Sequence, residues 1–81
     1  MSDPAFRAAA AQRMLTDPLL IEVLDAIEAQ AVAVWRSTGL QQHAEREIAW
    51  QSLKAAERVR AALQGVVDNG LIESRRAVQA R

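Results

Sequence analysis

The sequence contains no cysteine, only three glycines, two prolines and three aromatic residues, and no excess of either charge. Without cysteine, neither disulfides nor thiolate metal sites can stabilise a small fold. Ten basic side chains balance ten acidic ones, so the chain exerts no overall attraction on nucleic acid or anionic lipid.

Long apolar runs are also missing. No stretch approaches the length of about 18 apolar residues that a membrane-spanning helix needs. The first residues, Met-Ser-Asp-Pro, lack the basic start and apolar segment of a secretory signal. We therefore expect no membrane contact and a cytoplasmic location.

The chain is rich in small apolar residues instead. Its 81 residues make one small domain, and hydrophobic residues are 51% of the total. Because 17 of these are alanine, few side chains are large enough to fill a core. A single chain is therefore expected to have low stability.

Two Asp-Pro pairs, at residues 3–4 and 17–18, mark the starts of helices. In each pair the aspartate suits the capping position and the proline suits the first helical position. The first pair predicts a helix over residues 4–15. This helix is rich in alanine, and its best anchors are Phe6 and Met14.

The second pair predicts a helix over residues 18–38, because larger apolar side chains recur there every three or four positions. Gly39 is expected to end it in a left-handed conformation. A third helix is predicted over residues 43–69 and closed by Gly70, leaving 71–81 as a basic tail. The short link between the long helices demands antiparallel packing. The predicted fold is an all-α helical hairpin with a short N-terminal helix.

The third helix is more apolar than a hairpin requires, since its apolar positions cover about half of its circumference. One set can face the second helix: Ala49, Leu53, Ala56, Leu63 and Val67. A second set points to one side, and the first helix can cover only part of it: Ile48, Ala55, Val59, Ala62 and Val66. We expect this second set to form the interface of a homo-oligomer, a dimer or larger.

Several charged residues invite a functional interpretation. Glu22, Asp25 and Glu28 form an acidic ladder on the second helix. Nothing desolvates these carboxylates for acid–base chemistry, so a solvated face or a docking patch for arginine is the better interpretation. Arg60 falls inside the apolar arc near Leu24. It either extends outward along Leu24 or meets a carboxylate from another chain.

The residue types needed for catalysis are scarce. With one histidine and no cysteine, no nucleophile–base pair stands out, and the three glycines are too scattered for a phosphate-binding loop. His43 and Glu47 supply only two of the three or four ligands that a metal site needs. We expect no enzymatic activity, no cofactor and no bound metal.

Two tryptophans and three arginines are further candidates for a binding role. Trp35 and Trp50 flank the link, where they close the end of the hairpin core or serve as a ligand platform or interface anchor. Only Arg75, Arg76 and Arg81 form a local positive excess. Direct nucleic-acid binding is therefore expected to be weak or absent, and any contact should come from these three arginines.

One series of residues runs from the end of the first helix to the end of the third: Leu15-Thr16-Asp17-Pro18-Leu19-Leu20, Trp35, Arg46-Glu47, Trp50, Leu53, Val59-Arg60, Leu63, Val66-Val67 and Gly70. This series resembles the small helical-hairpin proteins encoded in the head and packaging gene clusters of tailed phages and prophages. The resemblance implies a role in head assembly or genome packaging, other head or packaging proteins as partners, and a location in the host cytoplasm or the virion. The alternative is a nucleic-acid-associated regulator or the oligomerisation module of a small packaging terminase.

Overall fold

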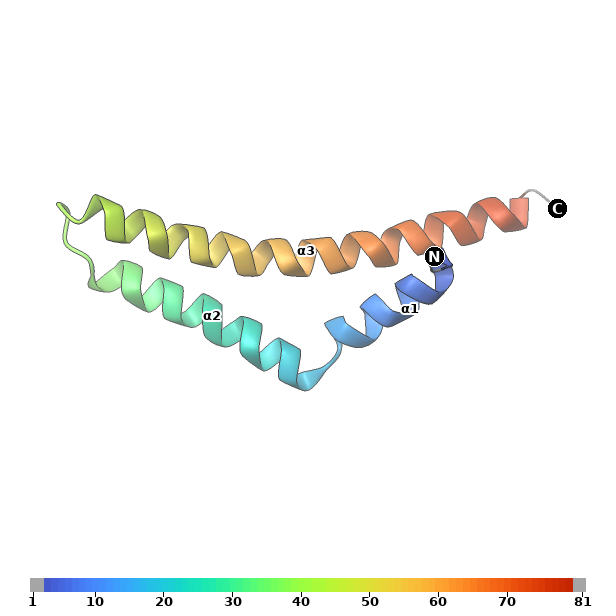
Figure 1. Cartoon of the computed structure of the whole chain (residues 1–81), viewed down its shortest axis with the longest axis horizontal. Helices are drawn as coiled ribbons and strands as arrows, with labels where there is room; N and C mark the ends of the chain where they lie inside the picture. The colour runs from blue at the N-terminus through green and yellow to red at the C-terminus, as the bar shows by residue number, and fades with distance from the viewer. Residues whose placement is uncertain (1–2, 80–81) are drawn as a thin grey trace.

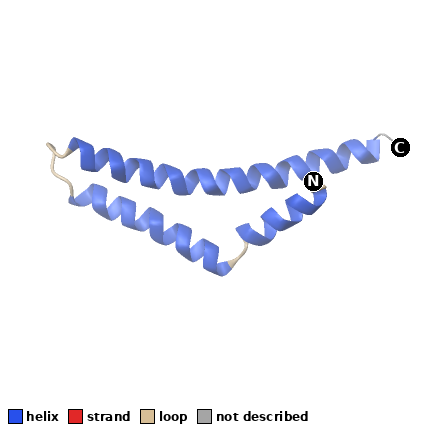
Figure 2. Ribbon diagram, viewed as in Figure 1, coloured by secondary structure: helices blue, strands red, loops and turns tan. Residues whose placement is uncertain are grey.

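The computed structural model describes residues 3–79, which form three α-helices and no strand (Figure 2). The helices are α1 (Pro4–Leu15), α2 (Pro18–Ser37) and α3 (His43–Gln79). The predicted all-α fold is confirmed, and α1 and α2 begin and end within one residue of the predicted bounds.

Both Asp-Pro pairs start helices as predicted. The Asp3 carboxylate accepts a hydrogen bond of 3.2 Å from the backbone N–H of Ala5. The Asp17 carboxylate accepts two, from Leu19 at 2.8 Å and from Leu20 at 3.1 Å. These carboxylates satisfy backbone donors that have no partner within the first helical turn.

The end of α2 differs from the prediction. Thr38, and not Gly39, terminates the helix by taking an extended conformation, and no glycine in residues 3–79 has a positive φ. The Thr38 hydroxyl donates to the carbonyl oxygen of Trp35 at 2.6 Å, and its backbone N–H donates to the same oxygen at 3.2 Å. Because Thr38 satisfies the carbonyl oxygen of Trp35 in the last turn, no glycine in a left-handed conformation is needed there.

The end of α3 was also predicted wrongly. The helix runs through Gly70 to Gln79, so residues 71–79 are helical and not a separate tail. Gly70 is buried against α1, where an added Cβ would clash with the methyl group of Ala8 and lie 2.9 Å from the carbonyl oxygen of Pro4. The packing of α1 on this part of α3 outweighs the low helix propensity of glycine.

α3 is the spine of the molecule. α1 and α2 lie along the same side of it, one after the other, and meet at a bend around residues 16–17 (Figure 1). Both run antiparallel to α3, so the first turn of α1 lies beside the C-terminal part of α3 (Figure 1). The result is an elongated body of 61 × 23 × 19 Å.

The contact between α1 and α3 is made by small residues. Ala11 is buried and Ala8 faces Gly70, whereas Phe6 is 65% exposed and Met14 is also exposed. The expectation that Phe6 and Met14 anchor this helix is therefore wrong. The alanine side faces α3 because it allows the two backbones to approach closely at Gly70.

The hydrophobic core is correspondingly small. The buried apolar residues are Ala11, Leu24, Ala31, Ala49 and Ala56. Leu24, at 6% exposed, is the only large side chain among them. Burial of alanine contributes little to stability, because a methyl group removes little apolar surface from water.

Candidate interaction surface

The hairpin of α2 and α3 has two unlike sides, separated by the line of buried residues between the helices. This line consists of Leu24 and Ala31 from α2 with Ala49 and Ala56 from α3. In each helix the two residues are seven positions apart, which keeps them on the same side of the helix. The side chains next to this line define the two surfaces of the hairpin.

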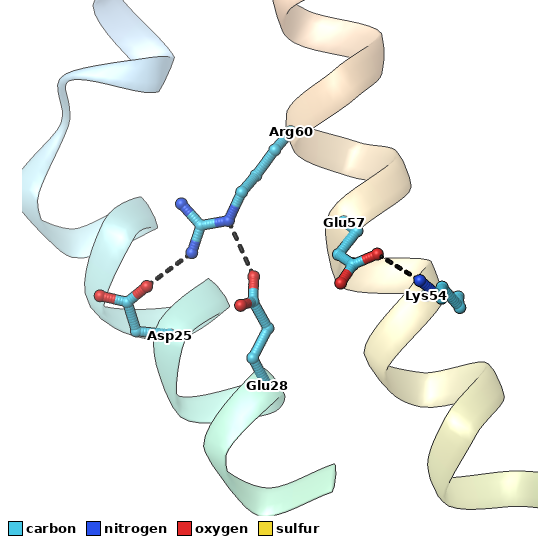
Figure 3. A network of polar contacts seen from close by, with 5 residues as sticks. All are labelled: Asp25, Glu28, Lys54, Glu57 and Arg60. Carbon is cyan, nitrogen blue, oxygen red and sulfur yellow. Dashed lines mark hydrogen bonds and ion pairs between the residues drawn. The ribbon is translucent and has the colours of Figure 1, made fainter. Parts of the chain in front are cut away.

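One surface carries an ion-pair network that joins the two helices. The Arg60 guanidinium donates to Glu28 at 2.9 Å and to Asp25 at 2.6 Å (Figure 3). Two carboxylates of the predicted acidic ladder thus bind an arginine, and the arginine belongs to the same chain. The partners of Arg60 differ from the predicted carboxylate of another chain, because both carboxylates come from α2 of the same chain.

The network keeps Arg60 charged. The hydrogen bond that Arg60 donates to Glu28 raises the pKa of the Arg60 guanidinium above its ordinary value, and the charge of Glu28 and the contact with Asp25 act in the same direction. Partial burial opposes this effect but does not outweigh it. Arg60 is therefore a fixed cation on this surface.

Both tryptophans lie on the same surface, at the loop end of the hairpin. The Arg46 guanidinium lies 4.3 Å from the centre of the Trp35 ring, and the Lys54 ammonium lies 4.4 Å from the centre of the Trp50 ring. Arg46 also donates to the Thr38 hydroxyl at 3.3 Å. The cations stack on the aromatic faces, while each indole stays roughly half exposed.

The opposite surface is apolar. Ile27 directly precedes Glu28, and Val59 directly precedes Arg60. Since consecutive residues are turned by about 100° around a helix, both side chains fall on the far side of the buried line from the ion pairs. Ile27 is 42% exposed and Val59 is 44% exposed.

We call this surface the apolar face. It consists of Val23, Ile27 and Val34 from α2 and of Ile48, Ala55, Val59, Ala62 and Val66 from α3. The five residues from α3 are those that the sequence predicted for self-association, and they occupy an arc of about 60° on the helix. Ile48 is 64% exposed, and Val66 is half-buried.

The contribution of α2 to the apolar face was not predicted from the sequence. Val23, Ile27 and Val34 are exposed beside the predicted set, on the neighbouring helix. The signal for them was present, since they recur at helical spacing beside Leu24 and Ala31. All of these apolar residues looked equally suited to the hairpin core until the structure showed which of them are buried.

The two predicted nucleic-acid contacts within residues 3–79, Arg75 and Arg76, do not form a concentrated positive surface. Arg75 and Arg76 are exposed in the last turns of α3, and Arg76 pairs with Glu73 at 3.2 Å. Arg81 lies outside the described residues. Most of the positive charge that Arg76 brings is therefore balanced by its neighbour on the same helix.

Residues 3–79 show no cluster of three or more His, Asp or Glu side chains that could hold a metal ion. Within the same residues, no helix combines the length and apolar character needed to cross a bilayer. Comparisons of the chain with protein families, curated proteins and solved structures found no match.

Proposed function

We propose that this chain is a non-enzymatic assembly protein that works as a self-associated oligomer. The observation that carries the proposal is that the surface holds many more large apolar side chains than the core does. Among residues 3–79, Leu24 is the only large apolar side chain that is buried, whereas residues such as Leu19 and Ile48 remain mostly exposed. Monomeric proteins avoid contiguous apolar patches of this kind.

The exposed area supports the same proposal. The chain exposes 6319 Å², whereas a compact monomer of its mass is expected to expose about 4,800 Å². The difference is about 1,500 Å² per chain, and a standard interface takes about 800 Å² from each partner. Self-association can bury this additional surface.

For the biological setting we propose phage or prophage head assembly or genome packaging, with other head or packaging proteins as further partners. The resemblance to phage helical-hairpin proteins is what supports this part of the proposal. The alternative, a nucleic-acid-associated regulator or terminase oligomerisation module, has less support, because the arginines near the end of α3 are few and Arg76 is paired.

Light scattering coupled to size exclusion tests the proposal. At micromolar concentration we expect a mass of at least twice the 8.9 kDa of one chain. Val59→Glu should return the protein to a folded monomer, because Val59 is partly exposed in one chain but would place an unpaired charge in the interface. Ala61→Glu, at an exposed position of the same helix, is the matched control and should leave the mass unchanged. A wild-type monomer throughout this range would contradict the proposal.

A further inference from the structure

We propose that a second copy of the chain docks on the apolar face of α2 and α3 together, forming a four-helix coiled coil. In this dimer α2 of each copy lies against α3 of the other. The inference rests on the proposed self-association and adds the occupant, the surface and the arrangement.

The spacing of the residues on the apolar side of the hairpin supports a coiled coil. On α3 the positions alternate in steps of four and three: Ile48, Ser52, Ala55, Val59, Ala62 and Val66. On α2 the same alternation links Val23, Ile27, Gln30 and Val34. An average step of about 3.5 residues is the repeat with which helices interlock as knobs into holes. The buried line of the hairpin consists of other residues. Each helix therefore has a second row of regularly spaced residues, which we call its exposed seam, available for a partner.

Neither exposed seam contains a charged residue, so two copies can meet there without burying a charge. The polar members are Gln30 and Ser52. The Ser52 hydroxyl already donates to the carbonyl oxygen of Ile48 at 3.0 Å, within its own helix. An uncharged face can pack against its own copy in a closed two-fold dimer, because no like charges oppose each other.

The register of α2 along α3 determines which residues would face each other when α2 of one copy packs against α3 of the other. Arg60 reaches both Asp25 and Glu28, and Arg46 reaches Thr38, so the level of each α2 residue on α3 is known. A two-fold axis parallel to the helices leaves the height of each residue along that axis unchanged. Residues of α2 and α3 at the same height in one chain are therefore also at the same height between the two copies.

The axis then pairs a larger residue of α2 with a small residue of the partner's α3 at three levels. These pairs are Val23 with Ala62, Gln30 with Ala55, and Val34 with Ser52. Ile27 meets Val59 between them. Facing layers that alternate large and small side chains interdigitate without voids.

The area also suits a second copy. Each partner of a standard-size interface contributes about 800 Å². The chain as a whole exposes about 1,500 Å² more than a compact monomer of its mass, so an interface of this size can be accommodated within its additional surface.

Disulfide trapping tests the arrangement, because the chain contains no cysteine of its own. Gln30→Cys and Ala55→Cys chains are refolded together and oxidised mildly, and the products are separated by mass. We expect a disulfide that links one Gln30→Cys chain to one Ala55→Cys chain as the main product, because only facing positions bring the two sulfur atoms within bonding distance. Each variant alone, and Gln30→Cys mixed with Ala61→Cys as the matched control, should remain largely unlinked. All three positions are exposed in one chain, and circular dichroism verifies that each variant stays helical.

Different failures have different meanings. A disulfide between two Gln30→Cys chains would place α2 against α2 and overturn the proposed arrangement. An oligomer by light scattering that gives no disulfide in the mixed sample would overturn the apolar face as the interface, while self-association itself stands. A protein that remains monomeric by light scattering would overturn both proposals.

Discussion

The methyl group of Ala8 in α1 fills the space in which a side chain on Gly70 of α3 would begin. The carbonyl oxygen of Pro4 lies against the same position. We expect Gly70→Ala to push α1 away from α3 and to lower the free energy of unfolding by about 1–3 kcal/mol, the usual effect of overpacking. Chemical denaturation followed by circular dichroism measures this loss.

Gly65 offers the matched control for this change. An added methyl group at Gly65 meets no atom within 4 Å. Gly65→Ala should therefore stabilise the protein by up to about 1 kcal/mol through helix propensity alone. If both substitutions stabilised the protein equally, the close approach of α1 to Gly70 would be incorrect.

Leu24 and Leu53 should differ in their contribution to stability. Leu24 is buried at 6% exposure, so Leu24→Ala should cost about 2–5 kcal/mol. Leu53 is half-buried on the tryptophan side of the hairpin, and Leu53→Ala should cost less, about 1–2 kcal/mol. Denaturation titrations of the two variants provide the comparison. A larger loss at Leu53 would indicate that a partner covers the tryptophan side and not the apolar face.

The two carboxylates bound to Arg60 should also contribute unequally to stability. The Glu28 side chain is 30% exposed and that of Asp25 is 65% exposed. Solvent screens the more exposed pair more strongly. Glu28→Gln should therefore lower the melting temperature more than Asp25→Asn does, and thermal unfolding at low salt measures both. The reverse order would show that the contact between Arg60 and Asp25 dominates.

The raised pKa of Arg60 determines the pH dependence of this network. A raised pKa in the folded state stabilises the protein at every pH below the ordinary arginine value and is lost only as the pH rises through the folded value. From about pH 7 to about pH 10, the difference in melting temperature between the wild type and Arg60→Gln should therefore stay constant, because arginine remains protonated. A difference that shrinks over this range would mean that another group controls the network.

The arginines near the end of α3 provide a test of nucleic-acid binding. Any association with DNA should be weak and sensitive to salt, since about three cations release few counterions. Replacing Arg75, Arg76 and Arg81 with alanine should abolish it, as measured by fluorescence anisotropy over a salt series. Tight binding that survives the triple substitution would favour the regulator over the assembly protein.

The sequence alone was sufficient for the features that depend on near neighbours. The Asp-Pro pairs at residues 3–4 and 17–18 predicted two helix starts, because a capping carboxylate acts on backbone groups two or three residues away. The short link between the long helices likewise predicted their antiparallel packing. The apolar set of α3 beside the hairpin core was predicted from periodicity, because one hairpin partner can cover only one side of a helix.

The tertiary structure decided the features that depend on distant residues. Gly70 has the local character of a helix end, but contact with Ala8, 62 positions earlier in the chain, places it inside α3. Arg60 finds carboxylates more than thirty positions away, which no local pattern identifies. The apolar residues of α2 could be divided into a buried line and an exposed seam only once the position of α3 was known. Periodicity shows that side chains share one side of a helix, whereas the position of the neighbouring helix determines which of them are buried.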